Sequence, residues 1–208
     1  MEPEWKDTGH ALQYLARADT IPHRTEGEAA LLEEVPPGCR RVLDLGTGNG
    51  RLLALVLLRV PSSAEAVAID FSRAMLERAR ERFAANERVR VLEHDLALPL
   101  PEIGTFDLVV SSFAIHHLAH PRKKKLYDEI WSRLEPGGVF CNLEHVASPT
   151  ARLHERFLAA LGGAEDASNI LLDVETQLRW LRAIGFDDVD CLWKWRELAL
   201  LAGVKPAG

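Results

Sequence analysis

Arg41-Val-Leu-Asp-Leu-Gly-Thr-Gly-Asn-Gly50 is the stretch of sequence that decides the fold. Its apolar half, Val42 to Leu45, has the hydrophobicity of a strand that is buried on both faces of a parallel sheet. The three alternating glycines that follow let the backbone turn sharply and approach a ligand without a Cβ in the way. The apolar run Leu52 to Leu58 then predicts a helix that packs back on the strand. The stretch therefore predicts a ligand-binding turn.

Dinucleotides, phosphates and adenosyl ligands all use glycine-rich turns, and the spacing of the glycines distinguishes them. The dinucleotide fingerprint Gly-x-Gly-x-x-Gly would place its third glycine at position 51, which is Arg51. No Gly-Lys-Ser/Thr is present, so a P-loop is excluded. Asp44, Gly46, Gly48 and Gly50 match the pattern Asp/Glu-x-Gly-x-Gly-x-Gly. This pattern resembles the first motif of the class I S-adenosylmethionine-dependent methyltransferases, and the resemblance implies S-adenosyl-L-methionine as cofactor.

Strand and helix patterns alternate from residue 41 onward. Strands are predicted at 41–46, 65–71, 89–94, 106–112 and 138–146, and helices at 49–60, 73–85 and 122–134. This alternation predicts a parallel sheet with helices on both faces. Two more helices are predicted at about 150–161 and 174–184, followed by strands at 186–195 and 197–204. The short connection between these last strands makes them an antiparallel pair.

The terminal hairpin separates this pattern from a plain dinucleotide-binding fold, because the resembling family closes its sheet with such a hairpin. The resemblance implies a Rossmann-like α/β fold with a seven-stranded, mostly parallel sheet, an antiparallel C-terminal hairpin and a helical cap. We expect one methyltransferase domain over residues 1–208. Its expected parts are an N-terminal helical cap segment (1–37), a cofactor-binding core (38–146), a cap insertion (147–172), and a last helix with the terminal hairpin (173–208).

Composition restricts the partners and the compartment. The formal net charge of −6 argues against a broad basic face for nucleic acid. The one basic run, Arg122–Lys125, is interpreted as the solvated start of a helix. Cys39, Cys141 and Cys191 lack a Cys-x-x-Cys spacing, so a cytoplasmic location without disulfides or zinc is predicted. The acidic amino terminus and the short apolar runs predict neither a signal peptide nor a membrane span.

Two acidic residues near strand ends are candidates for binding the cofactor. Asp70 ends the second strand, where a carboxylate can accept hydrogen bonds from both ribose hydroxyls; an ordinary helix cap is the alternative. Asp95 follows the third strand, and the resemblance implies that it accepts from the adenine amino group while the next amide, of Leu96, meets a ring nitrogen. Phe71 and Met75 could lie against the ribose and the adenine, or belong to the core.

The resemblance supplies the remaining candidates for cofactor binding. The backbone around Ser112 and Phe113, after the fourth strand, would touch the methionine part of the cofactor. Thr47 lies between the first two glycines of the first motif and is included with them. Arg24 belongs to the expected cap and could pair with the carboxylate of the methionine part or of a substrate; an exposed structural arginine is the alternative.

Methyl transfer is an in-line displacement at a sulfonium, so the enzyme aligns the acceptor and, for hydroxyl or ammonium acceptors, removes a proton. His116 and His117, after the fourth strand, are the best-placed bases, because imidazole accepts protons near neutral pH. His145, beside Glu144 at the end of the fifth strand, is the next candidate. In the resembling family the His-His-Leu run also serves packing and the shape of the cofactor pocket. A metal held by His145, His154 and Glu144 fits no established ligand spacing, so no metal is predicted.

We therefore predict methyl transfer from S-adenosylmethionine to a small-molecule acceptor, with O-, N- or C-methylation undetermined. The acidic charge favours a small molecule over nucleic acid. So does the sequence Ser111-Ser-Phe-Ala114, which stands where amino-methylating nucleic-acid enzymes carry Asn/Asp-Pro-Pro-Tyr/Phe. One alternative is a non-catalytic protein that binds an adenosyl ligand, which would keep the same motifs. A nicotinamide-dependent reductase is disfavoured by Arg51 and the hairpin. The acceptor and the oligomeric state are not encoded in these motifs.

Overall fold

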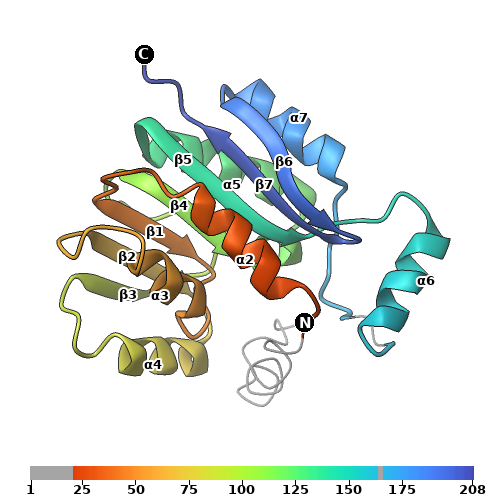
Figure 1. Ribbon diagram of the computed structural model, residues 1–208, viewed down its shortest axis with the longest axis horizontal. Coiled ribbons are helices and arrows are strands. Elements are labelled where there is room, and N and C mark those ends of the chain that lie inside the picture. Colours follow the sequence, from red (N-terminus) through yellow and green to blue (C-terminus); the bar gives the residue numbers. More distant parts are fainter. Residues whose placement is uncertain (1–20, 164–165) are drawn as a thin grey trace.

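The computed structural model describes residues 21–163 and 166–208. In this part of the chain, seven strands form one sheet in the order β3-β2-β1-β4-β5-β7-β6 (Figure 1). They are β1 (Arg41–Leu45), β2 (Glu65–Asp70), β3 (Val89–Glu93), β4 (Phe106–Ser112), β5 (Leu134–His145), β6 (Asp187–Trp195) and β7 (Leu198–Val204). The first five strands pair in parallel, and β7 is antiparallel to β5 and β6. The predicted seven-stranded sheet with its terminal hairpin is confirmed.

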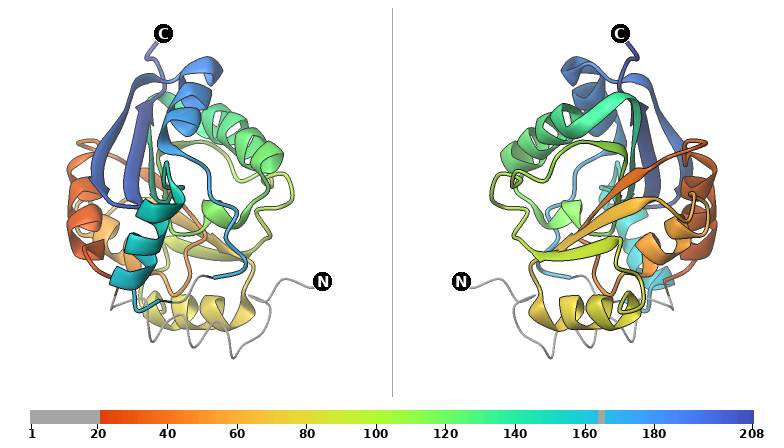
Figure 2. Two further views of the ribbon diagram at one scale, coloured as in Figure 1. Left: turned by 90° about the vertical axis from the view of Figure 1, so that its right-hand side faces the viewer. Right: turned by 90° about the vertical axis from the view of Figure 1, so that its left-hand side faces the viewer.

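Helices cover both faces of the sheet (Figure 2). They are α2 (Arg24–Glu33), α3 (Arg51–Leu57), α4 (Arg73–Arg82), α5 (His120–Arg133), α6 (Ala151–Ala160) and α7 (Val174–Ile184), with a short 3-10 helix, η2 (Ile115–His117). α2 and α3 pack on one face, and α5 and α7 pack on the other. α6 lies to the side of these helices (Figure 1), and its Phe157 is fully buried in the same apolar layer as α2 and α3. None of the described helices combines the length and the hydrophobicity needed to cross a membrane.

Two apolar layers form the core, because alternate residues of the central strands point to opposite faces of the sheet. On β1, Val42 belongs to the layer that contains Leu53 of α3, while Leu43 belongs to the layer that contains Ile130 of α5 and Leu181 of α7. All these side chains are fully buried. This two-sided burial explains the continuous apolar run at the start of the deciding stretch.

The chain leaves β1 through the glycine turn, where Gly46, Gly48 and Gly50 have φ angles of 68°, 55° and 78°. A Cβ at Gly46 would lie 2.1 Å from the Cβ of Ala114, and one at Gly50 would lie 2.5 Å from the ring of Phe83. At Gly48, a Cβ would meet no atom of the described residues within 4 Å. The outer glycines thus allow close packing, whereas the middle one borders open space.

The described part of the expected N-terminal cap segment packs on the sheet. α2 lies against β5, β6 and β7, and its Leu31 is fully buried in the core. His23 precedes α2 with a φ of 60°, so the helix begins sharply at Arg24. Residues 1–20 of the expected segment lie outside the described residues. The proposed division of the chain at residues 37, 146 and 172 stays a prediction.

The basic run at the start of α5 differs from the solvated helix start that we predicted. Lys123 is fully buried, and its Nζ donates a hydrogen bond to the carbonyl of Ile170 at 2.9 Å. Arg122 forms an ion pair with Glu129 at 2.5 Å. Only Lys124 and Lys125 are exposed. The run does lie near the start of a helix, but the predicted solvation was wrong for Arg122 and Lys123, because a helix turns consecutive residues to different sides.

Candidate active site

A cavity of about 330 Å³ lies at the carboxyl ends of β1 and β4. The strand order reverses here, since β2 and β3 follow β1 on one side and β5 follows β4 on the other. Open α/β sheets bind ligands at such a point of reversal. Most of the predicted site residues border the cavity: Arg24, Asp44, Gly46, Thr47, Gly48, Asp70, Phe71, Met75, Asp95, Leu96, Ser112, Phe113 and His117. Gly50, His116 and His145 do not border it.

Asp70 joins the end of β2 to the glycine turn. Its Oδ2 accepts a hydrogen bond from the backbone amide of Gly48 at 2.9 Å, and its Oδ1 accepts one from the amide of Ser72 at 2.8 Å. Burial raises the pKa of Asp70, and these amides oppose that rise. Each carboxylate oxygen can accept a further hydrogen bond. The two interpretations of Asp70, support of the next helix start and ligand binding, are therefore compatible.

Asp44 lies at the cavity wall and is 1% exposed. Its Oδ2 accepts from the Thr47 hydroxyl at 2.6 Å, whereas its Oδ1 has no hydrogen-bond partner in the described part of the chain. Burial raises the pKa of Asp44 to about 7; the Thr47 bond opposes this rise and the nearby charge of Asp70 adds to it. A buried acceptor atom without a donor fits a ligand that carries a positive charge. The residues present therefore fit a cationic cofactor.

Two arginines share one glutamate beside the cavity. Arg24 Nε donates to Glu28 Oε1 at 2.8 Å, and Arg51 donates to both carboxylate oxygens of Glu28 at 2.9 Å. Although burial opposes ionisation, the two guanidinium groups hold the pKa of Glu28 below its ordinary value. Glu28 thus links the start of α2 to the start of α3 beside the cavity. Both arginines border the cavity, and a guanidinium there can pair with a carboxylate, such as that of a methionine moiety.

Phe113 is held in a strained conformation at the end of β4. Its φ of 52° lies in the left-handed region, which costs a residue with a Cβ roughly 1–2 kcal/mol. Its backbone amide donates to the carbonyl of Leu143 at 2.9 Å, and the guanidinium of Arg24 lies 5.5 Å from the centre of its ring. These contacts on both sides fix the turn that leads from β4 to η2. Such strain is typical of functional sites.

The three predicted bases occupy three different environments. His117 borders the cavity. His116 is buried, with its Nδ1 2.6 Å from Glu144 Oε1, because successive residues of a 3-10 helix point about 120° apart and cannot share one side. His145 Nε2 lies 3.0 Å from Glu197 Oε2, in the turn between β6 and β7. The structure therefore leaves His117 as the one predicted histidine that borders the cavity.

Burial governs the protonation of the histidine pair. Burial and the adjacent His116 lower the pKa of His117 to about 3, while Ser168 and Asp166 oppose the shift. Burial also lowers the pKa of His116 and raises the pKa of Glu144. His117 is therefore neutral over the ordinary pH range. It can accept a proton there, but it does not titrate near the usual value for histidine.

No group of three or more His, Cys, Asp or Glu side chains within residues 21–163 and 166–208 is arranged to hold a metal ion. The pair considered from the sequence, His145 and His154, meets a different carboxylate from the one expected. His154 Nδ1 lies 3.0 Å from Glu197 Oε1, and His145 contacts the other oxygen of the same residue. Glu197, not Glu144, thus connects α6 to the end of β5.

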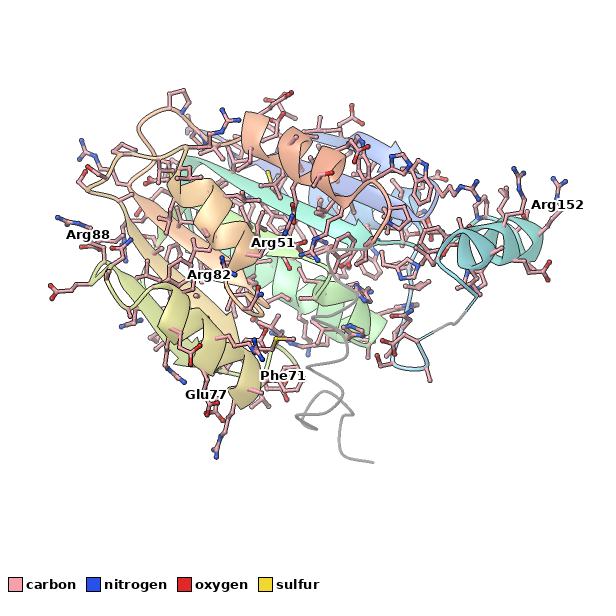
Figure 3. The ribbon with its side chains drawn as sticks, turned by 60° about the horizontal axis from the view of Figure 1, so that its bottom comes forward. Arg51, Phe71, Glu77, Arg82, Arg88 and Arg152 are labelled. Atoms are coloured by element: carbon pink, nitrogen blue, oxygen red, sulfur yellow. The ribbon has the colours of Figure 1, made fainter. Side chains whose placement is uncertain are left out.

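Sequence reasoning missed several residues of the cavity wall. They are Asn49, Arg51, Leu52, Ser72, Arg78, Ala97, Ala114, Leu118 and Ser168. Figure 3 shows Arg51 at the start of α3 and Phe71 just before α4. Most of the missed residues follow motif residues closely, so extending each motif along the chain could have found them. No sequence signal indicates Ser168, which reaches the site from a distant segment.

Comparison with known proteins identifies the family. A family model described as a methyltransferase domain matches residues 42–138. A demethylmenaquinone methyltransferase from Clavibacter sepedonicus is 34% identical over 197 residues, with 83% of this chain and 76% of that protein covered. The chain belongs to the class I S-adenosylmethionine-dependent methyltransferases. This membership confirms the predicted enzyme class and the predicted cofactor.

Two further proteins resemble this methyltransferase. A trans-aconitate 2-methyltransferase from Variovorax paradoxus is 34% identical over 149 residues, with 70% of this chain and 55% of that protein covered. The crystal structure of human N-acetylserotonin methyltransferase in complex with S-adenosylmethionine has the same fold, with a TM-score of 0.71, 19% identity, and 98% of this chain and 58% of that chain covered. The methyltransferase thus spans little more than half the length of these two proteins.

Proposed function

We propose that this methyltransferase binds S-adenosylmethionine in the cavity at the ends of β1 and β4 and transfers its methyl group to a small-molecule acceptor. The observation that carries the proposal is the meeting of Asp44, Asp70 and Asp95 around one cavity, beside a glycine turn that is open at Gly48. When bound, the cofactor supplies a sulfonium whose methyl carbon is open to in-line attack. The protein has to align the acceptor and, where the acceptor carries one, remove a proton.

Each wall of the cavity suits one part of the cofactor. Asp70 would accept from the ribose hydroxyls, because its carboxylate is fixed by backbone amides and retains lone pairs. Asp95 would accept from the adenine amino group; its Oδ1 is oriented by the amide of Ala97 at 2.8 Å. Asp44 and Arg24 would bind the ammonium and the carboxylate of the methionine part. Phe71 and Met75 would flank the ribose and the adenine.

The remaining predicted residues support this arrangement. Gly46 and Gly50 allow the close packing of the turn, and Thr47 orients Asp44. Ser112 Oγ is buried without a hydrogen-bond partner in the described residues, so it could meet a polar group of the ligand. His117 is the residue that we propose as the base, because it borders the cavity and is neutral at ordinary pH.

Calorimetric titration with S-adenosylhomocysteine, run beside NADH, tests the cofactor assignment. Binding of the homocysteine ligand without binding of NADH is the expected result, and the reverse would overturn the assignment. Turnover of S-adenosylmethionine with demethylmenaquinone or trans-aconitate, the acceptors named for the relatives, would then dismiss a non-catalytic binding role. These two acceptors are a starting point, and the acceptor of this enzyme is open.

Asp70→Ala is expected to weaken S-adenosylhomocysteine binding by about 1–3 kcal/mol, the scale of lost hydrogen bonds to a charged acceptor. Asp107→Ala is the matched control, because Asp107 also accepts from two backbone amides, those of Arg40 at 2.7 Å and Arg41 at 2.9 Å, but does not border the cavity. Both variants should lose stability, and only Asp70→Ala should lose affinity. Unchanged affinity in folded Asp70→Ala would contradict the ribose assignment.

We further propose that the enzyme works in the cytoplasm without a nucleic-acid or membrane partner. The net charge of −6 and the three free cysteines support this proposal. Retention of the purified protein on immobilised DNA or RNA at physiological salt would contradict it.

A further inference from the structure

The segment Asp166–Leu172, which we name the strap, has no helix or strand but is anchored firmly beside the cavity. The amide of Ile170 donates to the carbonyl of His116 at 2.9 Å, and the carbonyl of Ile170 accepts from buried Lys123. His120 Nε2 lies 3.2 Å from the carbonyl oxygen of Leu171. η2 and α5 therefore fix the strap in place, and the strap brings new side chains to the site.

Ser168 of the strap borders the cavity and meets His117 at one ring nitrogen. Nδ1 of His117 lies 3.0 Å from Ser168 Oγ and 3.3 Å from the Ser168 carbonyl oxygen. The Ser168 hydroxyl in turn donates to Asp166 Oδ1 at 2.6 Å, and the Ser168 amide donates to the same oxygen at 2.9 Å. Three side chains thus form a chain of hydrogen bonds that starts at the cavity.

The order of donors and acceptors in this chain fixes the tautomer of His117. A carbonyl oxygen can only accept, and the Ser168 hydroxyl has already given its hydrogen to the Asp166 carboxylate. Both atoms therefore offer lone pairs to Nδ1, so Nδ1 carries the hydrogen. In this tautomer the acceptor lone pair of the ring is on Nε2. A base with this orientation is prepared to receive a proton at Nε2.

We propose that Ser168 and Asp166 are positioning residues that relay a proton from the methyl acceptor through His117. The proposal rests on the proposed function and extends it to a substrate class, acceptors that lose a proton when they are methylated. As the bond from the methyl carbon to the acceptor oxygen or nitrogen forms, the bond to sulfur breaks and its electron pair stays on sulfur. The acceptor proton passes to Nε2, the Nδ1 proton to Ser168 Oγ, and the hydroxyl proton to the Asp166 carboxylate.

The relay solves a problem that burial creates. A histidine whose pKa is about 3 is a weak base, and an imidazolium at this position would be costly. Among the described residues, the other titratable groups around His117 are His116 in η2, whose ring centre lies 4.0 Å away, Glu144 in β5 and Asp166 in the strap. Passing the second proton on to Asp166 leaves the ring neutral. Asp166 is partly exposed, so it can return the proton to water.

The first test needs no acceptor. NMR of isotope-labelled protein reports which ring nitrogen carries hydrogen, and His117→Gln assigns the His117 signals. The expected wild-type result is the Nδ1–H tautomer. Ser168→Ala should shift the population toward Nε2–H, Ser168→Thr should keep it, and Ser62→Ala, at an exposed site, should change nothing. A wild-type ring that carries its hydrogen on Nε2 would overturn the proposal.

The second test uses turnover with two probes. 1,4-Dihydroxynaphthalene loses a hydroxyl proton when it is methylated on oxygen, whereas the carboxylates of trans-aconitate have no proton to lose. With the hydroxyl probe, Ser168→Ala and Asp166→Asn should lower kcat by about 100-fold, the scale of general base catalysis, with KM little changed. Ser168→Thr should restore the rate, and exposed Asp187→Asn should match wild type.

Three outcomes separate the relay from the proposed function. Turnover of trans-aconitate alone, or an effect of Ser168→Ala on KM alone, would contradict the relay. Lack of S-adenosylhomocysteine binding would instead contradict the proposed function. The tautomer of His117 can be measured in either case, because that measurement needs no ligand.

Discussion

Asp44→Asn is expected to stabilise the ligand-free protein at alkaline pH and to weaken its binding of S-adenosylmethionine. The reason is the buried carboxyl at the end of β1, whose pKa is raised by burial from 3.8 to about 7. Between about pH 4 and about pH 7, the Asp44 carboxyl is therefore protonated in the folded protein but ionised in the unfolded chain. Stability through this group is therefore fully present below about pH 4 and is lost as the pH rises through about 7.

The size of the effect follows from the shift. A pKa change of about three units corresponds to on the order of 4 kcal/mol of unfolding free energy lost between about pH 4 and about pH 8. The asparagine is neutral throughout, but its amide replaces an atom that has no partner in the described residues, which costs about 1–2 kcal/mol. A net gain of about 2–3 kcal/mol is expected at about pH 8, and a net loss of about 1–2 kcal/mol at about pH 4.

Urea unfolding of both proteins across this pH range measures the effect. Asp70 and Glu144 also have pKa values raised by burial, so the wild-type curve contains their contributions. The difference between the two proteins reports Asp44 together with its coupling to Asp70. Asp187→Asn, at an exposed position, is the control and should follow wild type. Parallel loss of stability in wild type and Asp44→Asn would contradict a raised pKa at Asp44.

The fold could be predicted from sequence because its signals are local. Burial on both faces makes β1 apolar from Val42 to Leu45 except at Asp44, and the glycine turn marks where the strand ends. Element ends were predicted less well. The helix expected at 49–60 is Arg51–Leu57, because Gly50 has a left-handed φ of 78° and the helix begins after it. β5 begins at Leu134, earlier than expected, because Leu134 pairs with Phe106 ahead of an irregularity in register.

The site could be predicted only where it is built from strand ends. Asp44 is next to last in β1, Asp70 ends β2 and Asp95 follows β3, and parallel strands bring such ends together. The histidines differ, since two neighbours in one motif, His116 and His117, face different surroundings that only the structure reveals. Ser168 lies 51 positions from His117, and Glu197 lies 52 positions from His145 and 43 from His154, so nothing in the local sequence indicates these contacts.

Gly46→Ala and Gly48→Ala are expected to damage different properties, although both glycines have a left-handed φ in the same turn. At position 46 the new Cβ would lie 2.1 Å from Ala114 Cβ, so the turn or the chain after β4 must move. Backbone strain of roughly 1–2 kcal/mol and overpacking of roughly 1–3 kcal/mol together predict a loss of about 3 kcal/mol in unfolding free energy. At position 48 the strain applies without the clash, so the loss should stay near 1 kcal/mol.

Gly46→Ala and Gly48→Ala should also differ in a second property, their affinity for S-adenosylhomocysteine. The Cβ at position 48 would enter the space that borders the cavity, where a ligand rather than protein is expected, so the affinity should fall at least about tenfold, or 1.4 kcal/mol. Gly38→Ala is the matched control, because Gly38 has a φ of 76°, has no described atom within 4 Å of its Cβ position, and does not border the cavity. It should lose the same stability as Gly48→Ala and keep full affinity. Equal affinities in these two variants would mean that the cofactor does not approach the turn at Gly48.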